Sequence, residues 1–266
     1  MDAIATSWAF SPIYGDFSNL TYGETVVKVE LKSVIFTSDH GLLTDYNSNY
    51  TGSGGTVYNP RGWTETGTNN PISHTKGTNI SANVKLCIQP TGLGYNLTGD
   101  GFVQYLSFHT NGVTSSGSDQ ALALVADTNL PVKVDVINHS INWSVNFGGT
   151  MCVTTSSGPH KVYVTWGNPG TGPTLKRMDW ACGNAQGATS ITTAAEDFKD
   201  IISVNPGYDR DNLGNNTWNT NSWQFLDSNQ RGDCITLAAL ACTGLRMIGI
   251  PATLCWSFPT ADSSAG

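Results

Sequence analysis

Residues 232–252 read GDCITLAALACTGLRMIGIPA, and this stretch decides the fold of the C-terminal part of the chain. Small and aliphatic side chains recur there at alternating intervals of four and three residues, at Cys234, Ala238, Ala241, Leu245 and Ile248. This spacing lines one face of an α-helix. Most of the remaining positions are also apolar. The sequence therefore predicts a helix that is buried at the centre of a domain.

Both ends of this helix carry recognisable signals. Asp233 is a good N-cap, because its carboxylate can accept from the unpaired N–H groups of the first turn. Gly249, followed by Pro251, is a typical stop. These limits place Cys234 at the first helical position.

A cysteine at this position has two interpretations. The helix dipole and the unpaired N–H groups favour a negative charge, so they lower the pKa of a thiol and promote the nucleophilic thiolate. Asp233 opposes this effect, since a neighbouring carboxylate disfavours a second anion. The alternative is that Cys234 is only a small core side chain, because cysteine is among the most buried residue types.

The motif favours the first interpretation. Gly232-Asp233-Cys234, with Ala238, Leu245-Arg246 and Gly249-Ile250-Pro251-Ala252 in register, resembles the transglutaminase-like superfamily of papain-type cysteine enzymes around its nucleophile. The segment 223–227 is similar to the short helix before that nucleophile, and 251–258 to the strand after its helix. The resemblance covers residues 190–258.

This resemblance implies an α+β cysteine-proteinase core with a Cys–His–Asp triad, in which Cys234 is the nucleophile. In a cleft of this family, Trp218 and Trp223 could wall the substrate site or help to polarise the oxyanion; the alternative is that both only pack under the loop. The backbone N–H of Cys234, at a helix N-terminus, would be the natural donor to the oxyanion. In this family the His and then the Asp follow the Cys, but the 32 residues after Cys234 contain no histidine, and their only acid is Asp262.

Three explanations stay open for the missing histidine. The chain is a fragment whose continuation supplies His and Asp, or the triad is lost in a non-catalytic relative, or one of the five histidines before Cys234 folds across to meet it. The core is accordingly expected to be incomplete.

Residues 1–168 are dominated by short apolar or alternating runs separated by turn-forming residues, which predicts an antiparallel β-sandwich. The expected strands are 25–36, 83–88, 101–108, 121–126, 132–137, 141–147 and 161–166. A Gly/Pro-rich stretch then predicts a linker over 169–175. Beyond it, 192–202 has helical spacing. The chain is therefore predicted to be multidomain: a β-sandwich over 1–168 and a transglutaminase-like domain over 176–266.

Two loops are candidate ligand sites. The segment 44–77 is rich in glycine and aromatic residues, and its Trp63 and Tyr58 either form a flat platform for a sugar or peptide or fasten the loop to the sandwich. Asp209, Asp211 and Asn212 could hold Ca²⁺, but they lack the EF-hand pattern. No other cofactor and no metal site is expected, because the six cysteines show no zinc spacing.

The composition limits the partners and the compartment. Charged residues make up only 12% and the net charge is −7, which argues against nucleic acid and anionic membrane surfaces. The chain contains no long apolar run for a membrane span and no secretory signal of its own. The neutral, loop-rich composition is typical of extracellular or cell-envelope proteins.

Two features of the sequence matter in an exported protein. Cys87 and Cys152 are the pair suspected of forming a disulfide. Seven Asn-X-Ser/Thr sequons are potential sites of N-glycosylation, but only if the protein is exported.

Two functions follow from these observations. The first is thiol-dependent acyl transfer or hydrolysis on a glutaminyl or peptide amide through Cys234, in the complete gene product. The second is a non-catalytic extracellular module that binds a peptide or a cell-surface glycan with a degenerate transglutaminase-like domain. Residues 1–266 alone are expected to be inactive.

Overall fold

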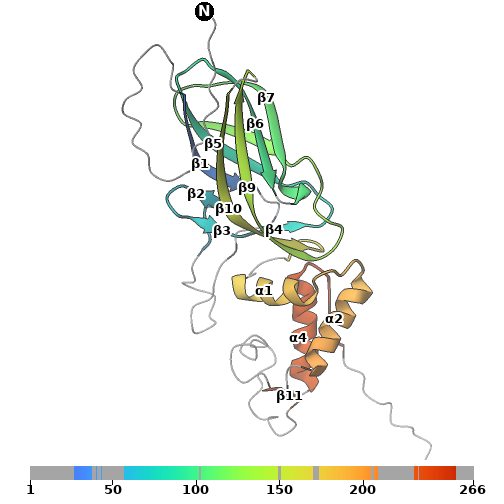
Figure 1. Ribbon diagram of the computed structural model, residues 1–266. Helices are drawn as coiled ribbons and strands as arrows, with labels where there is room; N and C mark the ends of the chain where they lie inside the picture. The colour runs from blue at the N-terminus through green and yellow to red at the C-terminus, as the bar shows by residue number, and fades with distance from the viewer. Residues whose placement is uncertain are drawn as a thin grey trace, which may run out of the picture.

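A computed structural model describes residues 27–37, 40, 43, 57–101, 103–148, 151–169, 174–204, 207–208, 231–232 and 234–255 (Figure 1). Within these residues the chain first forms two five-stranded sheets and then a group of helices at one end of them. The structure is thus rich in sheet, with few helices.

The first sheet is antiparallel throughout and has the strand order β3-β2-β1-β5-β8. Its strands are β1 (Lys28–Phe36), β2 (Gly62–Thr64), β3 (Asn69–Asn70), β5 (Ser81–Gln89) and β8 (Gln120–Val125).

The second sheet has the order β4-β10-β9-β6-β7. Its strands are β4 (Ile72–Thr75), β6 (Gly94–Gly101), β7 (Phe108–Thr114), β9 (Asp135–Phe147) and β10 (Met151–Thr165). One pair departs from the expected antiparallel pattern, because β4 runs parallel to β10. The chain changes sheets at Pro71, the single residue between β3 and β4.

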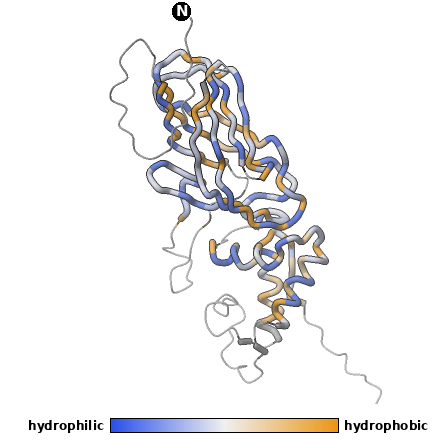
Figure 2. Tube along the Cα trace, in the orientation of Figure 1, coloured by the Kyte–Doolittle hydropathy of each residue, from blue (hydrophilic) through white to orange (hydrophobic). Residues whose placement is uncertain are grey.

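Alternation along the strands builds the core between the sheets. In β5 the even-numbered residues 82–88 are buried and the odd-numbered ones face outward, and Figure 2 shows the same alternation of hydropathy along the strands. The inward side chains of both sheets form one hydrophobic cluster. At its centre Trp143 is fully buried and stacks on Phe108 with ring centroids 6.0 Å apart. Gly99 makes room for it, because a Cβ at that position would lie 2.5 Å from the indole ring.

The observed strands correct several sequence predictions. Residues 101–108 do not form a strand, since the 3₁₀ turn Gln104–Leu106 lies there and buries Leu106 beneath Gly101. The two strands expected at 132–137 and 141–147 are one strand, β9. The strand expected at 161–166 begins earlier, at Met151, and β10 continues through a bulge at Gly158-Pro159, where the register with β9 shifts between Ser157 and His160. The part of the 44–77 loop that is described contains β2, β3 and β4.

The helices are α1 (Leu175–Asn184), α2 (Ile191–Val204) and α4 (Cys234–Met247). The helix predicted over 192–202 is confirmed as α2, and Ser190 caps it by accepting from the backbone N–H of Thr193 at 3.0 Å. The sequence did not predict α1. Thr174 caps that helix through a bond from the N–H of Arg177.

A second hydrophobic cluster joins the helices to the sheets. It contains Val134 and Tyr163 from the sheet side, and Met178, Cys182 and Phe198 from α1 and α2. Strands end at Thr165 and helices begin at Leu175, so the change of structure falls where a linker is predicted. The division into domains stays a prediction.

Candidate functional site

Cys234 is the first residue of α4, as the sequence predicts. A short parallel pair of strands, β11 (Gly207–Tyr208) and β12 (Arg231–Gly232), lies immediately before this helix. The backbone at Cys234 is therefore at a helix N-terminus, where unpaired N–H groups point away from the helix. Asp233, the expected N-cap, lies outside the described residues.

α4 buries a different face from the one predicted. Leu240, Gly244 and Met247 are buried, while Ala238, Ala241 and Leu245 of the predicted face are only half-buried. Gly244 decides this choice, because a Cβ there would lie 2.7 Å from the ring of Phe198 on α2. The missing side chain lets α2 approach this face closely. Among the described residues, α4 contacts α1, α2 and β12. The prediction that this helix is buried at the centre of a domain stays a prediction, because residues 209–230 and 256–266 lie outside the described part of the chain.

The C-terminal end of α4 is fixed against the sheets. Gly249 has φ +77°, and the N–H groups of Gly249 and Ile250 donate to the carbonyls of Arg246 and Leu245 at 3.0 and 2.9 Å. This is the Schellman arrangement that glycine allows, so the predicted stop is confirmed. The Ile248 carbonyl accepts at 2.8 Å from the N–H of Trp166, just beyond β10.

This anchoring places Cys234 far from the sheets. A helix of 14 residues is about 20 Å long, and its sheet-side end is the one that carries Gly249. Figure 1 shows α4 running away from the sheets towards β11. The thiol-bearing end of α4 is therefore about 20 Å from its junction with β10.

The five histidines all lie in or beside the sheets. His40 bonds to Ser73 and Thr75 of β4, at 3.1 and 3.0 Å. The other four are in strands: His74 in β4, His109 in β7, His139 in β9 and His160 in β10. The structure thus brings none of them to the N-terminal end of α4, which argues against the explanation that an N-terminal histidine folds across to Cys234.

The other predicted site residues are placed as follows. Trp63 is half-buried in β2 and packs against the cluster between the sheets. Tyr58 is half-buried and packs against the cluster of the helices, so the two side chains are not brought together. Trp218 and Trp223, and the possible Ca²⁺ ligands Asp209, Asp211 and Asn212, lie outside the described residues.

A polar contact that the sequence did not predict holds α1 to β10. Asp179 of α1 accepts a hydrogen bond from the hydroxyl of Tyr163 at 2.6 Å and pairs with Lys161. Burial, followed by the contact with Asp179, raises the pKa of the Tyr163 phenol. Burial also raises the pKa of the Cys182 thiol one turn further along α1. In the sequence, this contact is indicated only by the alternation that places Lys161 and Tyr163 on the same side of a strand.

Free thiols are present at Cys87, Cys152, Cys182, Cys242 and Cys255, which corrects the suspected disulfide between Cys87 and Cys152. Cys87 lies on the outer face of the first sheet and Cys152 is exposed on the second, so the core of the two sheets separates them. Cys182 is buried and Cys255 is exposed. These thiols are useful references for the reactivity of Cys234.

Among the described residues, no helix is long and apolar enough to cross a membrane.

Comparison with curated proteins gives no match to this chain. A family model does match its C-terminal part, over residues 179–264, and this range contains Cys234 and the stretch that carries the resemblance seen in the sequence. The C-terminal part of this chain therefore carries a domain of the transglutaminase-like superfamily.

Proposed function

We propose that Cys234 is the nucleophile of thiol-dependent acyl transfer on a glutaminyl or peptide amide. The observation that carries this proposal is the position of Cys234, at the first residue of a helix that lies inside the family match. In this proposal the chain consists of a β-sandwich domain followed by an α+β transglutaminase-like core, and the protein acts outside the cell or in the cell envelope.

The chemistry follows from the helix N-terminus. The thiolate of Cys234 attacks the amide carbonyl, and its backbone N–H donates to the oxyanion that forms. A histidine protonates the departing amine, and the thioester then passes its acyl group to an amine or to water. We assign the histidine and its orienting aspartate to chain beyond residue 266, because the family order places both after the cysteine. Trp218 and Trp223 would wall the cleft, and no cofactor enters the reaction.

The test is the rate of iodoacetamide labelling of each cysteine against pH, in native, unreduced protein, measured by peptide mass spectrometry. We expect Cys234 to label faster than the exposed Cys152 and Cys255 at neutral pH, with an apparent pKa well below the free value of about 8.5. Buried Cys182 is expected to stay unlabelled. Labelling of Cys234 only after denaturation would contradict the proposal.

Activity gives a second test. Residues 1–266 should show no turnover of an amide substrate, and Cys234→Ala should abolish the activity of a longer chain that includes a downstream His and Asp. Turnover by residues 1–266 would refute the assignment of the histidine to a continuation of the chain.

The location of the histidines favours one other function. Four histidines are in strands and His40 bonds to β4, whereas Cys234 begins a helix about 20 Å long whose other end is docked on the sheets. A degenerate domain that binds a peptide or a cell-surface glycan, with Trp63 or Tyr58 as a separate contact, is therefore the second candidate. Retention on a glycan or peptide column should then fall in Trp63→Ala. A Val29→Ala variant serves as the control, because it trims another half-buried side chain of the same cluster. Equal loss in both variants would refute a ligand role for Trp63.

A further inference from the structure

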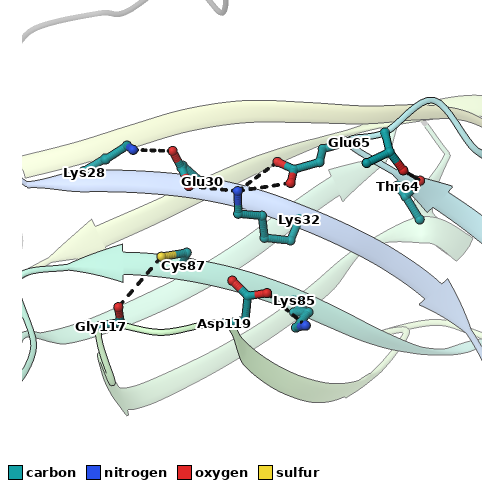
Figure 3. Close-up of polar contacts among 10 residues, drawn as sticks. Lys28, Glu30, Lys32, Thr64, Glu65, Lys85, Cys87, Gly117 and Asp119 are labelled. Carbon is teal, nitrogen blue, oxygen red and sulfur yellow. Dashed lines mark hydrogen bonds and ion pairs between the residues drawn. The ribbon is translucent and has the colours of Figure 1, made fainter. Parts of the chain in front are cut away.

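The outer faces of the two sheets differ in chemistry. On the first sheet, charged side chains pair with one another: Lys28 with Glu30, Lys32 with Glu30 and Glu65, and Lys85 with Asp119 (Figure 3). The second sheet exposes small, mostly uncharged side chains instead. Its outward positions on β6, β9 and β10 include Asn96, Thr98, Asp100, Asn138, Ser140, Asn142, Asn146, Cys152, Thr154 and Ser156.

Three of the seven sequons lie on this second face. They are Asn96-Leu97-Thr98, Asn138-His139-Ser140 and Asn142-Trp143-Ser144. In each strand the middle residue points into the protein, so the asparagine and the hydroxyl residue of the sequon project together from the same face. All three asparagines are exposed. The register places Asn142 in the interior of the sheet, between Asp100 of β6 and Ser156 of β10.

We propose that this face accepts N-linked glycans, at Asn142 above all and also at Asn96 and Asn138. The inference rests on the proposed export of the protein and is independent of its catalytic chemistry. The donor is a lipid-linked oligosaccharide phosphate: the amide nitrogen of the asparagine forms a bond to the anomeric carbon, the bond from that carbon to the phosphate oxygen breaks, and the amide loses one proton as the lipid phosphate leaves.

The contacts of the individual asparagines agree with this assignment. The hydrogen bond from the N–H of Gly112 goes to the side-chain oxygen of Asn96, at 2.9 Å, and so does not use the nitrogen that a glycan takes. The sequon at Asn79 differs, because its side-chain nitrogen donates to the carbonyl of Ala126 at 2.8 Å. Asn79 is exposed as well, but it lies outside the second face and its nitrogen is tied to the backbone, so it is not assigned to this glycan face.

The experiment is secretion of residues 1–266 from a eukaryotic host behind a signal peptide. Glycans are removed enzymatically in ¹⁸O-water, which marks each occupied asparagine as a labelled aspartate for peptide mass spectrometry. We expect the mark at Asn142, and also at Asn96 and Asn138. Ser144→Ala should remove the mark from Asn142 alone.

Thr154→Ala is the matched control, because Thr154 lies in the same row as Ser144 on this face but completes no sequon. It should leave every mark in place. Secreted protein without a mark at Asn142, Asn96 or Asn138, whether or not other sequons are marked, would overturn the proposal. Thiol labelling of Cys234 in the same preparation tests the catalytic proposal separately, so the two can fail independently.

Discussion

Replacing His160 by glutamine should remove most of the acid sensitivity that this side chain gives the fold. His160 is only 1% exposed and lies at the bulge of β10. The indole N–H of Trp143 donates to the hydroxyl of Ser157 at 2.9 Å, and that hydroxyl lies 2.8 Å from Nε2 of His160. Nδ1 has no hydrogen-bond partner among the described residues. The site holds a neutral ring and offers nothing that would stabilise a second N–H bond.

Burial accordingly lowers the pKa of His160 to about 4, from its ordinary value of 6.5. Between these two pH values the unfolded chain binds a proton at this residue that the folded chain does not bind, so stability falls as the pH falls. At about 1.36 kcal/mol for each pH unit, folding is about 3 kcal/mol less favourable at pH 4 than at pH 7 because of this residue. That is a large part of the 5 to 15 kcal/mol, roughly, that holds a domain folded.

The assay is urea unfolding, followed by tryptophan fluorescence, of the wild type and of His160→Gln between pH 8 and pH 4. Other groups titrate in both proteins, so the difference between the two free energies of unfolding isolates His160. Above pH 7 this difference should be constant and reports packing alone. Towards pH 4 it should move by about 3 kcal/mol in favour of the variant. A difference that stays constant over the whole range would refute the reasoning.

Three further predictions concern the helices. Gly244→Ala should destabilise the protein by about 1 to 3 kcal/mol in urea unfolding, because the new methyl group meets Phe198. The control is Gly183→Ala in α1, where nothing lies within 4 Å of the new methyl group, and this variant should stabilise the protein by up to about 1 kcal/mol. If both variants are destabilised, the cause is not the contact with Phe198. Asp179→Asn should lower the free energy of unfolding by about 1 to 3 kcal/mol. In a double-mutant cycle with Tyr163→Phe, the two losses of stability should be strongly non-additive. Additive losses would mean that the 2.6 Å hydrogen bond between the two side chains adds no stability. Cys182 should resist alkylation until α1 separates from the sheets, so its labelling rate in increasing urea should follow global unfolding, and labelling well before that transition would show that α1 opens alone.

The ends of α4 could be predicted from the sequence because they depend on local chemistry. Gly249 has the positive φ that stops the helix, and the run from Cys234 to Ile248 contains no proline and only one glycine, Gly244. The buried face of the helix could not be predicted, because a helix that is apolar nearly all round offers several. A residue of another helix, Phe198, selects the face that contains Gly244.

The strands show the same division between local and distant causes. β1, β5 and β8 were predicted because their apolar residues alternate. β6 was missed, since its sequence GYNLTGDG resembles a turn, and Gly99 stands there to accommodate the ring of Trp143 from a neighbouring strand. Of the candidate site, the position of Cys234 was predictable, while the separation of the histidines from it depends on how α4 docks.

The cluster that α1 and α2 share with Val134 and Tyr163 also determines whether the chain can be divided into two pieces that fold separately. A module that is exchanged freely between proteins ends at a solvated boundary and carries its own complete core. Here a cut in the predicted linker would leave apolar side chains bare on both pieces. We therefore expect that residues 1–168 and 176–266, produced separately, would each be less stable than the same residues in the intact chain.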